Sequence, residues 1–288
     1  MEHAVQLDRV SKRYPGFALQ DISLSVKKGF ITGFIGPNGS GKSTTIRCIM
    51  NLVRKDAGSV HIFGRDIARH EREIKQRIGF VYDENYFYED LTVAEMKKLI
   101  APFYERWDDG QFRTYLEQFE VPKRKKIKEL SKGMKMKFSL AVALSHHADL
   151  IIMDEPTSGL DPVFRREILN ILRDFLQDEE KTVFFSTHIT TDLEQIADYI
   201  AFIYKGRMVF QTDKESLAES YGLIKGPKEL LDGDTKKYFV GLRVTDNGFE
   251  GLTGDLATAS RLFGGEALVE KATLEDIMYY TARGNDRV

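Results

Sequence analysis

The stretch Gly36-Pro37-Asn38-Gly39-Ser40-Gly41-Lys42-Ser43-Thr44 decides the fold of this chain. It fits the pattern G-x-x-x-x-G-K-[ST], in which glycines let a sharply turning backbone approach a phosphate closely. The apolar run 30–35 before it predicts a buried strand, and residues 45–53 after it predict a helix. Loop N–H groups and a helix N-terminus would then converge on one anion. We therefore predict a triphosphate-binding loop rather than a glycine-rich turn that matches by chance.

The side chains of this loop have separable roles. Lys42 supplies a full positive charge to the β- and γ-phosphates, and the Ser43 hydroxyl is a ligand for Mg²⁺. The other predicted nucleotide-binding residues of the loop are Gly36, Asn38, Gly39, Ser40, Gly41 and Thr44. The rest of the chain decides which reaction the loop serves.

Two carboxylates follow a second buried strand. Residues 150–153 are an apolar run of the kind found inside a parallel sheet, and Asp154 and Glu155 come directly after it. Open α/β sheets bind their ligands at the carboxyl ends of such strands. We expect Asp154 to hold Mg²⁺ and Glu155 to orient and deprotonate the attacking water, because phosphoryl transfer depends mainly on positioning and charge. The alternative is a solvated strand end. His188 follows a third buried run, 182–187, in the same way, and no other histidine has that position.

Composition bounds the remaining possibilities. The 288 residues suffice for one large domain with a smaller appendage, and 42 % hydrophobic residues suffice for a core. A net charge of −2 gives no reason to expect nucleic acid as a partner. The single cysteine, Cys48, favours a reducing cytoplasm and reads as a buried hydrophobe. We find no signal peptide and no apolar run near the roughly 18–20 residues that a membrane helix needs.

The order of the predicted elements suggests an α/β domain with an α-helical insertion. Strands are expected at 5–10, 18–26, 60–63 and 78–82, with a turn at 11–16, and a hairpin at 201–210. Between them, about 86–148 reads as helical, opened by Thr92 with Glu95 as its capping-box partner. The basic run 123–128 is either a solvated face or a contact with phosphates, acidic lipid or a partner.

The tail beyond residue 215 reads as a small α+β region without visible chemistry. A strand is expected at 238–244, a hairpin turn at 246–248 and a final helix opened by residues 273–276. We expect it to steady a dimer, with regulation or simple packing as alternatives.

Taken together, these motifs resemble the ABC ATPases, the nucleotide-binding domains of ATP-binding-cassette transporters. The resemblance covers about residues 3–215. It is carried by the phosphate loop, the signature-like stretch Leu130-Ser131-Lys132-Gly133-Met134, the run 150–155, the loop 158–161 and His188. Within this family, the motifs most resemble the ABC-2 type ATPases of bacterial exporters, such as the bacitracin-export and YtrB-like group.

The resemblance implies a P-loop NTPase fold, with a RecA-like core and an antiparallel β subdomain in residues 1–215, and an accessory α+β region in 216–288. It also implies a head-to-tail dimer with a second copy or a paralogous ATPase subunit, in which Ser131 and Gly133 of one chain close on ATP and Mg²⁺ held by the other. Tyr14 would stack on adenine, although by itself it reads as a turn tyrosine. His188 would sense the γ-phosphate. A separate transmembrane permease would hold the subunit on the inner, cytoplasmic face of the cell membrane.

Three departures from the family pattern matter. Lys132 and Met134 replace a glycine and a glutamine of the signature. Asp83, or Glu84 if the register slips by one, replaces a glutamine that touches Mg²⁺, and we expect Asp83 to be a metal ligand. The aromatic cluster 86–88 either adjoins the permease surface or packs between subdomains. A soluble ABC ATPase outside transport, or a nucleotide-gated module that does not hydrolyse ATP, are the alternative functions.

Overall fold

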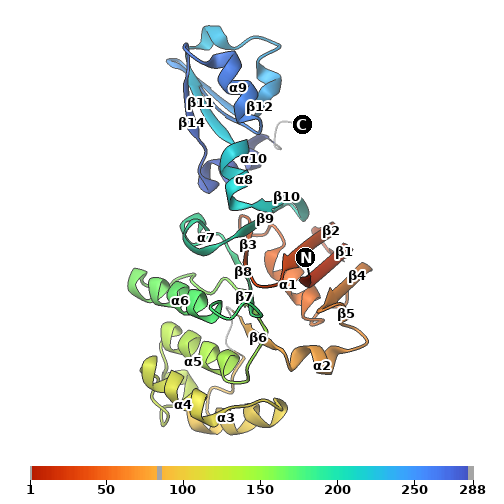
Figure 1. Ribbon diagram of the computed structural model, residues 1–288, viewed down its shortest axis with the longest axis vertical. Coiled ribbons are helices and arrows are strands. Elements are labelled where there is room, and N and C mark those ends of the chain that lie inside the picture. Colours follow the sequence, from red (N-terminus) through yellow and green to blue (C-terminus); the bar gives the residue numbers. More distant parts are fainter. Residues whose placement is uncertain (1, 83–85, 285–288) are drawn as a thin grey trace. The chain divides into compact units, whose positions relative to one another are not determined.

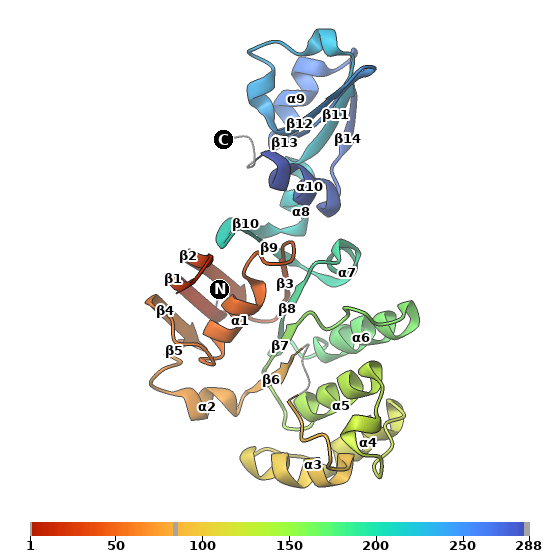
Figure 2. The same ribbon diagram turned by 180° about the vertical axis from the view of Figure 1, so that it is seen from behind.

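The computed structural model describes residues 2–82 and 86–284 (Figures 1 and 2). Contacts between elements divide the chain into two compact units, residues 1–211 and 212–288. The strands of the first unit are β1 (His3–Tyr14), β2 (Phe17–Lys27), β3 (Ile31–Ile35), β4 (Ala57–Ile62), β5 (Arg65–Asp66), β6 (Ile78–Val81), β7 (Leu150–Asp154), β8 (Thr182–Thr187), β9 (Tyr199–Tyr204) and β10 (Arg207–Asp213), whose last two residues belong to the second unit. Its helices are α1 (Lys42–Ile49), α2 (Glu71–Lys75), α3 (Val93–Ile100), α4 (Asp109–Gln118), α5 (Lys132–Leu144), α6 (Pro162–Phe175) and α7 (Thr190–Ile196).

The larger sheet of this unit has the order β10-β9-β3-β8-β7-β6, and β9, β3, β8, β7 and β6 are parallel neighbours. β3, β7 and β8 are buried along their whole length. Phe34 packs into the core that includes α1, whereas its neighbour Gly33 meets Leu193 of α7. Because successive residues of a strand point to opposite faces, helices cover both sides of the sheet.

A second, antiparallel sheet has the order β2-β1-β4-β5. Its inward side chains, such as Leu7 and Leu24, share one core with Ile46 and Ile49 of α1 and Ile152 of β7. Helix α1 therefore lies in the core between the two sheets. The free thiol of Cys48 belongs to this core, as expected for a buried hydrophobe.

The ends of the parallel strands create the edge that matters for function. Ile35 of β3 pairs with Thr187 of β8, and Asp154 of β7 pairs with Ser186. The loops that follow β3, β7 and β8 therefore leave the sheet at the same edge.

Two local predictions are wrong. Residues 11–14 are not part of a turn, because β1 continues to Tyr14 and pairs with Phe17 there, leaving Pro15 and Gly16 to turn the chain. The helix after the phosphate loop is α1, which starts at Lys42 and ends at Ile49 instead of spanning 45–53. Asn51 adopts a left-handed φ of 54°, a conformation that a helix cannot continue.

The described residues between β6 and β7 contain α3, α4 and α5, as predicted for a helical insertion. Helices α3, α4 and α5 lie together beside β6 (Figures 1 and 2). The Thr92–Glu95 capping box is confirmed, since the Thr92 hydroxyl accepts from the Glu95 N–H and the Glu95 carboxylate accepts from the Thr92 N–H. Of the helices within residues 2–82 and 86–284, none is long and apolar enough to span a bilayer.

In the aromatic cluster, Phe87 is half-buried, and its ring centroid lies 4.6 Å from that of Phe138 in the same helical subdomain. Tyr86 and Tyr88 are 61 % and 67 % exposed, and the ring centroid of Tyr86 lies 4.9 Å from that of Tyr82, the residue after β6. Both roles considered for the cluster stay predictions. In the basic run, Lys123 pairs with Glu117 and Lys128 with Asp90, so part of its charge is neutralised within the chain.

The second unit contains helices α8 (Lys214–Ser220), α9 (Leu256–Phe263) and α10 (Leu274–Gly284), and strands β11 (Gly222–Gly226), β12 (Phe239–Thr245), β13 (Gly248–Thr253) and β14 (Leu268–Lys271). The strands form an antiparallel sheet in the order β12-β13-β11-β14, and Phe249 and Phe263 lie in its core. The predicted hairpin at 246–248 joins β12 to β13, and Thr273 caps α10. The strands β11 and β14 are short and escaped prediction.

Candidate functional site

Glycines shape the phosphate loop, two of them because a side chain would collide with the surrounding chain and two because of their backbone conformation. A Cβ on Gly36 would lie 2.3 Å from the Ile203 carbonyl oxygen, and one on Gly41 would lie 2.5 Å from a methyl of Leu19. Gly39 and Gly41 have φ values of 76° and 112°, a region that L side chains rarely adopt. Gly41 is also the N-cap of α1, so the loop ends where unpaired helical N–H groups begin.

Lys42 is buried at the start of α1 and is held at three points. Its Nζ donates to the carbonyl oxygens of Gly36 at 2.6 Å and Pro37 at 3.3 Å. It also forms an ion pair with Glu155 Oε1 at 3.0 Å. The cation is thus fixed inside the loop by groups that a phosphate oxygen could replace as partners.

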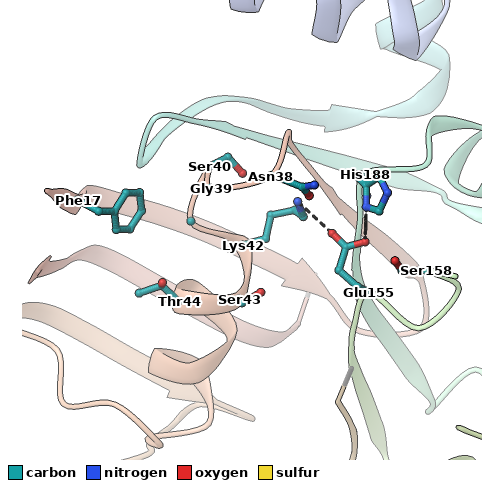
Figure 3. A pocket seen from close by; sticks show the side chains of 11 residues that line it. Phe17, Asn38, Gly39, Ser40, Lys42, Ser43, Thr44, Glu155, Ser158 and His188 are labelled. Atoms are coloured by element: carbon teal, nitrogen blue, oxygen red, sulfur yellow. Dashed lines mark hydrogen bonds and ion pairs between the residues drawn. The ribbon is translucent and has the colours of Figure 1, made fainter. Parts of the chain in front are cut away.

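Glu155 connects this lysine to His188 (Figure 3). The Nδ1–H of His188 donates to Glu155 Oε2 at 2.7 Å, and its backbone N–H approaches the same oxygen at 3.3 Å. The backbone N–H of Glu155 donates to the Ser186 hydroxyl at 3.1 Å. Glu155 has a left-handed φ of 50°, an uncommon conformation for a residue with a side chain. The three side chains therefore form a continuous Lys42–Glu155–His188 array.

Asp154 is the last residue of β7, directly before Glu155, and is 2 % exposed. Burial raises the pKa of its carboxyl group, and the charge of Glu155 acts in the same direction, whereas hydrogen bonds from Ser186 and Ser43 and the charge of Lys42 lower it. The Ser186 hydroxyl donates to Asp154 Oδ1 at 2.5 Å. Sequence reasoning missed Ser186, although it precedes His188 by two residues in a run already singled out.

The array opens into a cavity of about 590 Å³. Its lining comprises Phe17, Asn38, Gly39, Ser40, Gly41, Lys42, Ser43, Thr44, Glu155, Ser158 and His188. Apart from Gly36, which is not among the lining residues, the predicted loop residues come together with Glu155 and His188 around one space. Ser40 Oγ is buried in the loop without a hydrogen-bond partner, as expected where a phosphate oxygen would complete the site.

The residues also fit a magnesium ion brought in with phosphates. Across residues 2–82 and 86–284, no cluster of three His, Cys, Asp or Glu side chains could hold a metal by itself. Mg²⁺ normally keeps waters and binds through one or two carboxylates plus substrate phosphates. Ser43 and Asp154, which are close enough for the Ser43 hydroxyl to lower the pKa of the carboxyl group, offer such a partial ligand set. Asp83 and Glu84 lie outside the described residues, and the role of Asp83 as a metal ligand stays a prediction.

Tyr14, the predicted adenine contact, lies at the end of β1 and is 41 % exposed. Of the described residues, Phe17 rather than Tyr14 lines the cavity, and the two are paired across the β1–β2 turn. Sequence reasoning missed Phe17. Phe17 is the first residue of β2, directly after the turn at Pro15 and Gly16. The sequence could have indicated Phe17 as a site residue only if that turn had been predicted correctly.

Ser131 and Gly133 lie at the N-terminal end of α5, apart from the phosphate loop. Ser131 is the N-cap of α5, and its hydroxyl accepts from the Met134 N–H at 3.2 Å. Neither residue is among the described residues that line the cavity. A Cβ on Gly159 would lie 3.5 Å from Lys132 Nζ, so the signature-like stretch adjoins the 158–161 loop of its own chain.

Comparison with known proteins agrees with this geometry. Residues 19–158 match the family model described as ABC transporter. The ATP-binding protein YtrB of Bacillus subtilis is 31 % identical over 75 % of this chain and 74 % of its own length. The bacitracin transport ATP-binding protein BcrA of Bacillus licheniformis is 33 % identical over 67 % of this chain and 63 % of its own. A bacterial ABC transporter cassette solved as a dimer aligns with a TM-score of 0.65 and 25 % identity, over 73 % of this chain and 98 % of its own.

Proposed function

The chain belongs to the family of ABC transporter ATP-binding proteins, and we propose that it hydrolyses ATP to drive a separate membrane-spanning partner. The predicted P-loop NTPase fold and the predicted family are confirmed by the matches. Residues 1–215 would form the ATPase domain, with a helical subdomain at about 86–148, and 216–288 an accessory region. The observation that carries the proposal is the Lys42–Glu155–His188 array at the mouth of the phosphate loop.

We propose the following roles in binding. Lys42 exchanges its carbonyl and Glu155 partners for phosphate oxygens when ATP enters, and the loop N–H groups bind the same phosphates. The exchange is favourable because a polyphosphate carries more negative charge than one carboxylate. Tyr14 or Phe17 contacts the adenine base. Ser43 and Asp154 hold the Mg²⁺, which neutralises phosphate charge during phosphoryl transfer.

Hydrolysis follows from the release of Glu155. Once Lys42 turns to phosphate, the carboxylate of Glu155 is free to accept a proton from a water positioned against the γ-phosphate. His188 stays hydrogen-bonded to Glu155 and faces the same space, so it can hold the carboxylate and contact the γ-phosphate. Substituting Glu155 should therefore remove hydrolysis, while the phosphate loop keeps its ability to bind nucleotide.

The position of the signature supports a dimer. Ser131 and Gly133 start α5 outside the described lining of the cavity, so a second chain would have to bring its own α5 N-terminus to complete the site. We propose a head-to-tail pair, formed with a second copy or a paralogous subunit. The similar cassette named above was solved as a dimer.

A complementation experiment tests the dimer. Lys42→Ala removes the phosphate-binding cation but leaves Ser131, whereas Ser131→Arg blocks the signature but leaves Lys42. Each variant alone should lose ATPase activity, and an equimolar mixture should regain part of it, because one composite site per mixed pair is intact. Failure of every mixture to exceed the separate variants, with both folded and the wild type active, would contradict a shared site.

The partner remains to be identified by experiment. We propose a polytopic permease, with the subunit held at the inner face of the membrane, and an exported substrate that binds the permease alone; a similar protein is named for bacitracin transport. Tagged full-length chain purified from detergent-solubilised membranes should bring that permease with it. Retention of a ribosome or of DNA in its place would favour an ABC ATPase outside transport.

A further inference from the structure

A buried polar cluster joins the segment after Glu155 to the helix after His188. The Thr157 hydroxyl donates to Asp192 Oδ2 at 2.6 Å, and Arg165 Nη2 donates to Asp192 Oδ1 at 2.5 Å. Thr157 is 0 % exposed and Asp192 is 1 % exposed. These three residues come from the loop after β7, the first turn of α6 and the first turn of α7.

The carboxylate of Asp192 is the centre of this cluster. A buried carboxylate is costly unless each oxygen finds a donor, and here both oxygens have one. The bond to Arg165 is charge-assisted, which makes it short and strong. Arg165 also reaches the hydroxyl of Thr191 at 3.3 Å, so the guanidinium is itself tied to α7. The cluster is therefore a fixed joint rather than a surface ion pair.

The joint lies close in sequence to the two groups that meet at the site. Thr157 follows Glu155 by two residues, and Asp192 follows His188 by four. Glu155 has the left-handed φ of 50° noted above, a conformation that persists only where the surroundings hold it. On the other side, α7 is seated against β3, because Leu193 occupies the space that a side chain at Gly33 would need.

We propose that Asp192 is a positioning residue, which sets the distance between Glu155 and His188 by holding the segments that carry them. The proposal rests on the hydrolysis proposed above. Asp192 is not among the residues that line the cavity, so it would act through Thr157, Arg165 and the backbone. Its effect should therefore fall on the rate of the chemical step and not on nucleotide binding.

The sharpest test removes one hydroxyl from the joint. Thr157→Val is nearly isosteric and leaves Asp192 Oδ2 without its donor, whereas Thr157→Ser keeps the donor. Thr182→Val is the matched control, because Thr182 is also fully buried and its hydroxyl accepts one hydrogen bond, from the Gly29 N–H at 3.1 Å. All are made in the full-length chain, and their melting temperatures are measured first.

Thr157→Val should lower kcat for ATP about 10- to 100-fold, the range expected when a reacting group is displaced by up to about 1 Å. KM should change little, Thr157→Ser should restore the rate, and Thr182→Val should lose stability without losing kcat. In selectively ¹³C-labelled protein without nucleotide, the ring signals of His188 should shift in Thr157→Val but not in Thr182→Val.

Two results would overturn the positioning role: an unchanged kcat in a folded Thr157→Val, or His188 signals identical to those of the wild type. If the wild type and every variant fail to hydrolyse ATP, the proposed function falls. The His188 signals still decide whether the joint sets the geometry of the site.

Discussion

Replacing Glu155 by Gln tests the central array most directly. In the unliganded site Glu155 Oε1 lies 3.0 Å from Lys42 Nζ, and both side chains are largely buried. At an effective dielectric constant of about 20 the gross attraction of such a pair is about 5–6 kcal/mol. Much of it is offset by desolvation, so a charged hydrogen bond contributes about 1.5–3 kcal/mol and a neutral one about 0.5–1.5 kcal/mol.

In wild type, ATP must break the charged Lys42–Glu155 hydrogen bond, whereas in Glu155→Gln it breaks only a neutral one. The difference between these two contributions is the expected gain in binding free energy. Glutamine keeps the shape and one hydrogen bond but releases Lys42 from a charged competitor, so triphosphate binding should tighten by about 1.4 kcal/mol, or about tenfold. Hydrolysis should fall by about 10²- to 10⁴-fold, because a general base is lost. The variant would thus bind more tightly while turning over far less.

Binding is measured by calorimetric titration with a non-hydrolysable ATP analogue and Mg²⁺, so that turnover cannot distort the comparison with the wild type. Glu167→Gln is the control, since it breaks a Lys–Glu pair in the same unit, 3.2 Å from Lys137, away from the cavity. Equal analogue affinity in Glu155→Gln and wild type would refute competition for Lys42. Hydrolysis in Glu155→Gln at close to the wild-type rate would refute its role as the base.

Three further predictions concern the same site. Burial raises the pKa of Asp154 above the usual 3.8, so its charged form opposes folding. This cost is absent below pH 3.8, grows as the pH rises from 3.8 to the folded-state pKa, and is complete above that pKa. Asp154→Asn should therefore raise the metal-free melting temperature at pH 8 but much less near pH 4, and equal shifts at both pH values would contradict this. Gly36→Ala should abolish folding or nucleotide binding, because its Cβ would lie 2.3 Å from a carbonyl oxygen and 2.6 Å from Ser40 Oγ. The Cβ of Gly39→Ala meets nothing within 4 Å, so this variant should cost only about 1 kcal/mol of backbone strain. Equal melting temperatures for the two variants would show that the loop relaxes freely. Tyr14→Ala and Phe17→Ala test which aromatic ring contacts the adenine base. Removing the ring that stacks on adenine should weaken ATP binding by about 1–3 kcal/mol while leaving the binding of inorganic tripolyphosphate unchanged. A parallel loss for both ligands would place the effect in the phosphate loop.

The features predicted correctly are those encoded by neighbouring residues. The capping box needs only Thr92 and Glu95, three residues apart, and the structure has both of its hydrogen bonds. Buried runs such as 150–153 identify strands because both faces of a parallel sheet are covered. The errors at 11–14 and 50–53 are boundary errors, where pairing with β2 and a left-handed Asn51 overrode the local pattern.

Residue patterns were enough to identify the chemical groups of this protein: a phosphate loop, carboxylates and a histidine at strand ends, and a separate signature. The way in which these groups meet depends on contacts that exist only in the folded chain. Lys42 and Glu155 form an ion pair, and Thr157 bonds to Asp192, across sequence separations that no local pattern spans. Such contacts depend on strand order and register, which place the ends of β3, β7 and β8 at one edge. Phe17 and Ser186 entered the site for the same reason, since their neighbours in space are not their neighbours in sequence.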